Sequence, residues 1–189
     1  GYKPARGPGF PHHPRLQAGL SSGPIGCAFN AEQTMAGRID ARLKELGITL
    51  PAAPTPAANY VPFVRSDQLV FISGQIPTRD GKPQYLGRLG ETISLEDGVA
   101  AARLCALALL AQLKSACAGD LDRVRRVVKL GGFVASAADF TAQPKVVNGA
   151  SDLMVEVFGD AGRHARFAVG ANVLPLGVAV EVEGIFEVE

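Results

Sequence analysis

The sequence predicts a single α+β domain with the element order ββαβαββ, in which two helices cover one face of a mixed sheet. Two runs with helical spacing of apolar residues, each bounded by capping residues, alternate with runs rich in Val, Ile and Phe. The chain has 189 residues, of which 47% are apolar and 20% charged, as in a globular protein with one sizeable core. The pattern of strands and intervening helices favours one sheet with one helical layer.

The first 34 residues differ in character from the rest. They are rich in Pro and Gly and have no hydrophobic periodicity, so we expect a disordered or non-native N-terminal extension before a domain over residues 35–189. His12 and His13 lie in this segment, and we interpret the pair as incidental rather than as a metal site. The domain then opens with an extra amphipathic helix, because Ile39, Leu43 and Leu46 recur at helical spacing before Gly47.

Residues 60–64 and 69–77 predict two strands joined by a polar turn, and residues 78–83 form a loop with an Asp-Gly turn signal. Ser94 with Asp97 is typical of a helix N-terminus, and the helix should run to about residue 118, before Gly119. Residues 126–136 are largely apolar and predict an interior strand.

Pro144 begins the second helix, and Gly159 ends it. The last two strands are predicted at residues 165–175 and 178–188. Both contain apolar residues at odd and at even positions, so apolar side chains would point to both faces of the sheet. Both faces of the sheet therefore need cover. Since the sequence offers helices for only one face, we expect a second copy of the protein on the other.

The composition argues against several classes of function. Nineteen basic and eighteen acidic residues leave a formal net charge of +1, and the one basic cluster, at residues 123–129, follows two aspartates, so nothing suggests a nucleic-acid partner. No apolar run approaches the length of a membrane span. Three cysteines without metal or redox spacing favour a reducing compartment, so we predict a cytoplasmic protein without a metal.

Two charged residues interrupt the apolar C-terminal strands. Arg166 begins one strand and Glu181 lies in the next, and the short connection between them predicts an antiparallel pair that brings Arg166 close to Glu181 or Glu183. One interpretation is a structural cross-strand ion pair. The other is a guanidinium that binds a substrate carboxylate through two hydrogen bonds, with a glutamate nearby to manage a water molecule or a proton.

Three blocks of the sequence resemble the Rid (YjgF) family of reactive enamine/imine deaminases, formerly labelled L-PSP endoribonucleases. They read "FISGQIP", "GDLDRVRRVVKLGGFVAS" followed by "DF", and "HARFAVGANVLPLGVAVEVEGI", and the resemblance covers residues 59–189. It implies a chorismate-mutase-like fold, a homotrimer with clefts between subunits, and hydrolysis of 2-enamino or 2-imino acids to 2-oxo acids and ammonia without a cofactor.

The resemblance also assigns roles to single residues. Arg166 binds the substrate carboxylate, and Glu181 is associated with the water that attacks the imine carbon. Further cleft residues are implied at Phe63, Ser73, Gly74, Asn148 and Ala168. Many family members have Tyr at the position of Phe63, Cys at that of Ala168 and Pro at that of His164, which suggests a shifted substrate.

Two other functions remain open. The protein could be a non-catalytic module that binds small carboxylates such as 2-oxo acids; Arg166 would serve either function, whereas Glu181 is needed only for catalysis. RNA cleavage, which the older family name suggests, is disfavoured by the near-neutral charge.

Overall fold

The computed structural model describes residues 37–53 and 59–189. The expectation of a disordered extension over residues 1–34 lies outside these residues. The α-helices in the described residues are α1 (Arg38–Glu45), α2 (Leu95–Ala116) and α3 (Gln143–Phe158). Short 3-10 helices lie at Leu121–Arg123, Gly159–Gly162 and Pro175–Gly177. The strands are β1 (Phe63–Ser66), β2 (Leu69–Gln75), β3 (Thr78–Arg79), β4 (Lys82–Pro83), β5 (Val124–Ala135), β6 (Ala165–Ala171) and β7 (Val180–Val188).

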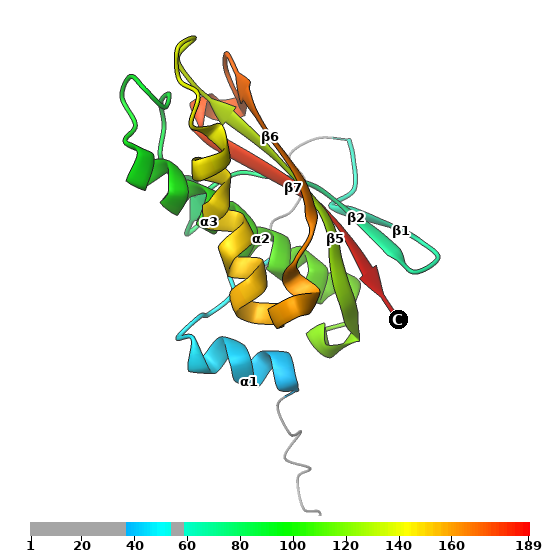
Figure 1. The fold of residues 1–189 in the computed structure, drawn as a ribbon. Coiled ribbons are helices and arrows are strands. Elements are labelled where there is room, and N and C mark those ends of the chain that lie inside the picture. The colour runs from blue at the N-terminus through cyan, green and yellow to red at the C-terminus, as the bar shows by residue number, and fades with distance from the viewer. Residues whose placement is uncertain (1–36, 54–58) are drawn as a thin grey trace, which may run out of the picture. The chain divides into compact units, whose positions relative to one another are not determined.

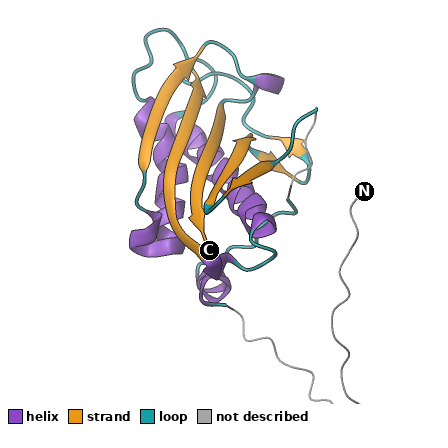
Figure 2. Cartoon of the chain, turned by 90° about the vertical axis from the view of Figure 1, so that its right-hand side faces the viewer, coloured by secondary structure: helices purple, strands orange, loops and turns teal. Residues whose placement is uncertain are grey.

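Five strands form one mixed sheet in the order β1-β2-β7-β5-β6, while β3 and β4 form a separate small hairpin. Strands β5 and β6 are parallel, connected through α3, and the other neighbours are antiparallel. Helices α2 and α3 cover one face of the sheet (Figure 1). Figure 2 looks onto the opposite face, where the strands lie in front of the helices. The predicted α+β architecture, with two helices on one face, is confirmed.

Local signals in the sequence account for both long helices. The hydroxyl oxygen of Ser94 accepts a hydrogen bond from the backbone N–H of Asp97 at 3.0 Å and so caps α2. Helix α3 has Pro144 in its first turn and ends at Gly159, whose positive φ of 62° suits a residue without Cβ. The predicted helix boundaries at these residues are confirmed.

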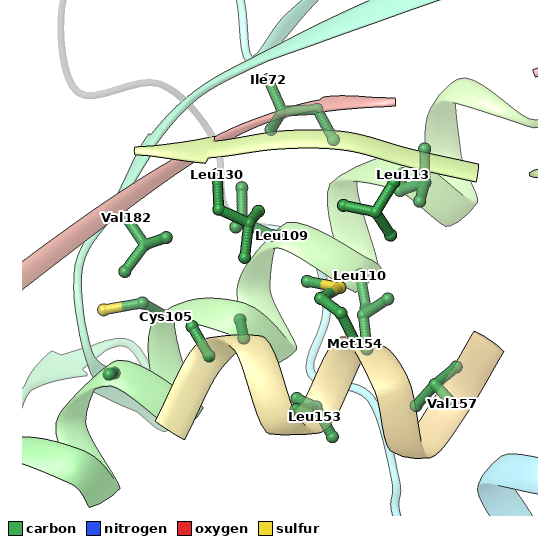
Figure 3. Packing of buried hydrophobic residues seen from close by; sticks show 14 of the residues in the cluster. Ile72, Cys105, Leu109, Leu110, Leu113, Leu130, Leu153, Met154, Val157 and Val182 are labelled. Carbon is green, nitrogen blue, oxygen red and sulfur yellow. The ribbon is translucent and has the colours of Figure 1, made fainter. Parts of the chain in front are cut away.

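The core lies between the sheet and the helical layer (Figure 3). Leu130 and Ile72 project from the sheet toward Leu109 and Leu113 of α2, and all four are buried. A second contact joins α2 to α3; its labelled side chains include Leu110, Leu153, Met154 and Val157. Helix α2 is long and apolar enough to cross a membrane, yet 56% of the relevant stretch is buried inside the domain. Its place in the core accounts for its hydropathy.

Helix α1 confirms the expected extra amphipathic helix. Ile39 and Leu43 are buried. The carboxylate of Asp122 caps the helix from a distant part of the chain, because it accepts hydrogen bonds from the backbone N–H groups of Arg38 at 2.7 Å and Ile39 at 2.8 Å. Helix α1 therefore belongs to the folded domain.

One prediction about the strands is wrong. Strands β6 and β7 are not neighbours, because β5 lies between them. The connection between them spans eight residues, 172–179, and includes a 3-10 helix, which is long enough to step past one strand. Every second residue of β7 is buried, whereas β6 has an exposed or half-buried side chain at every position. Burial thus favours β7 in the centre of the sheet and β6 at its edge.

Candidate functional site

Arg166 projects from the edge strand β6 toward the helical side of the sheet. It lies directly opposite Leu130 of β5, which is fully buried beneath the helices, and side chains opposite each other in neighbouring strands share a face. The guanidinium of Arg166 reaches α3. Its Nη1 donates to Oδ1 of Asn148 at 2.9 Å and to Oγ of Ser151 at 3.1 Å, and its Nη2 donates to the carbonyl oxygen of Pro144 at 3.3 Å.

These contacts leave part of the guanidinium available. All three acceptors are neutral, and the ion pairs found among residues 37–53 and 59–189 do not include Arg166. Both N–H groups of Nη1 are engaged, so the donors without a partner in the described chain are Nε–H and one N–H of Nη2. The side chain is half-buried. A planar anion can accept from the two remaining donors, as a carboxylate does from arginine.

A second layer of side chains supports the guanidinium. Oγ of Ser151, which accepts from Arg166, also lies 3.0 Å from Nε2 of His164. Nδ1 of His164 lies 2.6 Å from the carbonyl oxygen of Gly162. Burial lowers the pKa of His164; the bond to Gly162 opposes this shift, and the positive charge of Arg166 adds to it. The imidazole is therefore neutral at physiological pH. We call Arg166, Asn148 and Ser151 the arginine cluster.

Glu181 lies on the other face of the sheet. It pairs with Phe133 of β5, and its side chain is half-buried among the residues of the face without helices. Burial raises the pKa of Glu181, and repulsion from Glu183, which shares this face, raises it further. A carboxyl group with a raised pKa is suited to accept and return a proton near neutral pH.

Gly74 provides the space that Glu181 occupies. A Cβ atom at position 74 would collide with Oε1 of Glu181 and would lie 2.9 Å from its Cδ. The pairing of β2 with β7 is irregular between Ile72 and Gln75, so Gly74 lies in a β-bulge. The hydroxyl of Ser73 donates to the carbonyl oxygen of Val61 at 2.9 Å, which holds the segment before β1 beside the bulge. We call Glu181, Ser73 and Gly74 the glutamate cluster.

The arginine and glutamate clusters do not meet within one protomer. The expectation that Arg166 lies across the ladder from Glu181 or Glu183 is wrong, because β5 separates the strands and the side chains of Arg166 and Glu181 project to opposite faces. A structural ion pair between the two clusters of the same chain is therefore excluded. Within one protomer the predicted site residues form two separate groups, in which Arg166 contacts Asn148 and Glu181 lies against Gly74.

Two other predicted cleft residues have clear positions. Ala168 follows Arg166 on the same face of β6 and is half-buried opposite Gly132. Phe63 lies on β1, at the opposite edge of the sheet, where it is half-buried and packs against the core. Phe63 is thus far in the sheet order from Arg166 of its own chain. The exposed Tyr60, just before β1, presents a phenol that the sequence analysis did not include.

Ser151 was also absent from the sequence-based site. It follows Asn148 by three residues on α3, and residues three apart lie on one face of a helix. That spacing is the signal that would have found Ser151 once Asn148 and Arg166 were selected.

The face that carries Glu181 also presents exposed apolar side chains. Val64, Phe71 and Val169 are 54%, 41% and 43% exposed, and all three lie on this face by their pairing. Phe133 and Phe167 contact each other edge to face, with ring centroids 5.3 Å apart. This face therefore carries exposed apolar surface, as predicted, and none of the helices in the described residues covers it (Figure 2).

Within the described chain, no group of three or more His, Cys, Asp or Glu side chains is placed to hold a metal ion. Cys105 and Cys117 are buried as free thiols, and burial is the main cause that raises the pKa of each. Neither thiol belongs to the two clusters described above.

Comparison with known proteins agrees with this architecture. A family model described as "YjgF/chorismate_mutase-like, putative endoribonuclease" matches residues 40–187. The chain belongs to the YjgF/chorismate mutase-like family. Protein TCP17 of Trypanosoma cruzi is 52% identical over 152 residues, which are 80% of this chain and 94% of that protein.

Solved structures of the family have the same fold. The structure of Atu1372 from Agrobacterium tumefaciens is 49% identical with a TM-score of 0.75, and the match covers 80% of this chain and 92% of that one. RidA from an Antarctic Psychrobacter species is 25% identical with a TM-score of 0.51, and the match covers 74% and 98% of the two chains. The resemblance to the Rid (YjgF) family is therefore confirmed.

Proposed function

We propose that this protein hydrolyses reactive 2-enamino and 2-imino acids to 2-oxo acids and ammonia, in clefts formed between the subunits of a homotrimer. The observation that supports this proposal most strongly is the state of Arg166, whose guanidinium is held by neutral acceptors and keeps two donors for an anion. A structural arginine is normally paired with an acid when it is partly buried. Membership of the family that includes RidA supports the same function.

The arginine cluster suits a substrate that carries a carboxylate. A 2-imino acid has a planar carboxylate next to the reactive carbon, so two parallel hydrogen bonds from Nε and Nη2 of Arg166 would fix both the position and the orientation of that carbon. The tethers to Asn148 and Ser151 hold the guanidinium in place before the substrate arrives. The entropy cost of ordering the side chain is then met during folding rather than during binding.

The glutamate cluster suits the hydrolytic step. The enamine takes up a proton at its β-carbon and becomes the iminium; water then adds to the iminium carbon, with Glu181 accepting a proton from the attacking water. The same carboxyl group returns that proton to the amino group of the tetrahedral intermediate. The carbon–nitrogen bond breaks while the hydroxyl group of the intermediate gives up its proton to solvent, so that ammonia leaves and the carbonyl of the 2-oxo acid forms. Each step uses water and protons alone, so the proposed reaction requires no redox partner.

A second copy of the chain is needed to assemble this site. Arg166 and Glu181 of one protomer project to opposite faces of its sheet, so one molecule of substrate can reach both only where two copies meet. The face that carries Glu181 has exposed apolar side chains and is not covered by any helix of the described residues, as expected of a surface that packs against another subunit. We propose that the arginine cluster of one subunit faces the glutamate cluster of its neighbour.

A coupled assay tests the proposal. A dehydratase supplies 2-aminocrotonate, and formation of the 2-oxo acid is followed above the spontaneous rate. We expect acceleration by the protein, and a loss of about 100-fold in kcat/KM in Arg166→Ala, because charge-assisted hydrogen bonds to the carboxylate disappear. Arg163→Ala is the matched control, since Arg163 is exposed and its nearest charged partner is Asp160. Its activity should equal that of the wild type.

Two other outcomes would favour different functions. A wild-type protein that binds a 2-oxo acid through Arg166 without accelerating hydrolysis would be the small-carboxylate binding module. Degradation of RNA by the wild type but not by Arg166→Ala would favour the endoribonuclease described for the family.

A further inference from the structure

Four groups form a continuous hydrogen-bonded chain behind the guanidinium. Nη1 of Arg166 lies 3.1 Å from Oγ of Ser151, which lies 3.0 Å from Nε2 of His164, and Nδ1 of that ring lies 2.6 Å from the carbonyl oxygen of Gly162. The side chains of Ser151, His164 and Arg166 are all half-buried. These hydrogen bonds thus connect the backbone of the 3-10 helix before β6, through Ser151 of α3, to the proposed carboxylate-binding group.

The direction of every hydrogen bond in this chain is determined by chemistry. A carbonyl oxygen can only accept, so Nδ1 of His164 carries the hydrogen that reaches Gly162. In the neutral ring Nε2 is then an acceptor, and the hydroxyl of Ser151 must donate to it. Since the hydroxyl hydrogen of Ser151 is committed to His164, its lone pairs face the Nη1 hydrogen of Arg166.

We propose that Ser151 and His164 are positioning residues that hold Arg166 ready to bind a carboxylate. His164 orients the hydroxyl of Ser151, and this hydroxyl holds the Nη1 end of the guanidinium. The Nε–Nη2 edge is then left for the substrate. The kinetic consequence rests on the proposed function, whereas the orientation of the guanidinium does not. Without the acceptor at His164, the hydroxyl of Ser151 is free to rotate and its lone pairs are no longer held toward Arg166.

The proposal makes the two residues interdependent. Replacing Ser151 by Ala removes an acceptor from a charged donor, so we expect KM to rise about tenfold while kcat changes less than about twofold. His164→Leu should raise KM by a similar factor in the wild-type background and have almost no further effect in Ser151→Ala. His164→Gln, which offers an amide oxygen to Ser151, and Ser151→Thr, which keeps the hydroxyl, should both retain a KM near that of the wild type.

Nuclear magnetic resonance tests the orientation independently of activity. We expect the nitrogen shifts of His164 to report the Nδ1–H tautomer, and rotation about the Cζ–Nη1 bond of Arg166 to be slow in the wild type and at least about tenfold faster in Ser151→Ala. If the wild type shows no deaminase activity but these spectra are as expected, the positioning role stands and the proposed function fails.

Three results would overturn the inference. They are an Nε2–H tautomer of His164, an unchanged rotation rate of the Arg166 guanidinium in a folded Ser151→Ala variant, and an effect of His164→Leu that is equally large with and without the hydroxyl of Ser151. The last result would mean that His164 acts through the general packing of its loop rather than through Ser151.

Discussion

Substitution of Gly74 by alanine should move the carboxylate of Glu181 without removing it. A Cβ atom at position 74 would collide with Oε1 of Glu181, and its distances to Cδ and Cγ of that residue would be 2.9 and 3.2 Å. Ordinary van der Waals contact begins at 3.4 Å, so Cδ must retreat by about 0.5 Å and the oxygen by about 1 Å or more. A misplacement of about 1 Å in a catalytic group costs about 100-fold in rate.

We therefore expect Gly74→Ala to lower kcat in the coupled deaminase assay by about 100-fold, with little change in the affinity for a 2-oxo acid. The affinity should persist because Arg166 is held by Asn148 and Ser151, which the substitution does not touch. In the double variant with Glu181→Gln, the two losses should not add, because both act through the same carboxylate. A Gly74→Ala enzyme with kcat within twofold of the wild type, or losses that multiply in the double variant, would refute this reasoning.

Three further predictions concern stability. Because the pKa of Glu181 is raised in the folded protein, its charged form destabilises the folded state above that pKa. Glu181→Gln should therefore raise the melting temperature at pH 7 to 8. This gain should vanish as the pH falls toward 4.5, the ordinary pKa of a glutamate side chain. Equal melting temperatures at pH 8 would contradict it. Because the pKa of His164 is lowered in the folded protein, protonation favours the unfolded chain, and stability should fall as the pH drops from about 6.5 through the pKa of the folded state. In His164→Gln we expect a smaller loss of stability at acid pH, measured by thermal denaturation at each pH. Asp122→Ala removes the cap from the backbone N–H groups of Arg38 and Ile39, which should cost about 1 kcal/mol and expose the segment after α1 to limited proteolysis, with the deaminase activity unchanged. An unchanged proteolysis rate would show that packing alone holds α1.

The sequence was sufficient for the elements whose signals are local. Ser94 and Gly119 bracket α2, and Pro144 and Gly159 bracket α3, because capping and backbone restrictions act over a few residues. Glu181 and Glu183 lie on one face of β7 for the same kind of reason, because residues two apart in a strand share a face. These features depend on neighbours along the chain.

The order of the strands in the sheet depends on contacts between residues far apart in the sequence, which the local sequence pattern does not reveal. A short connection before β7 suggested a hairpin, but burial of every second residue of β7 favours the centre of the sheet, between β2 and β5. The same change in strand order moved Arg166 and Glu181 to opposite faces. The neutral partners of Arg166 came from α3, and only the packing of α3 on β6 brings Ser151 and Asn148 to the guanidinium.

The central claim is that Arg166 of one subunit and Glu181 of another form one site, and subunit mixing tests it most directly. Arg166→Ala and Glu181→Gln proteins, each with little activity alone, are unfolded together in equal amounts and refolded into mixed trimers. Random assembly pairs an intact arginine cluster with an intact glutamate cluster in about a quarter of the clefts, so we predict recovery of about a quarter of the wild-type deaminase activity. Mixed trimers, verified by mass spectrometry, that remain as inactive as the two parent variants would contradict the account.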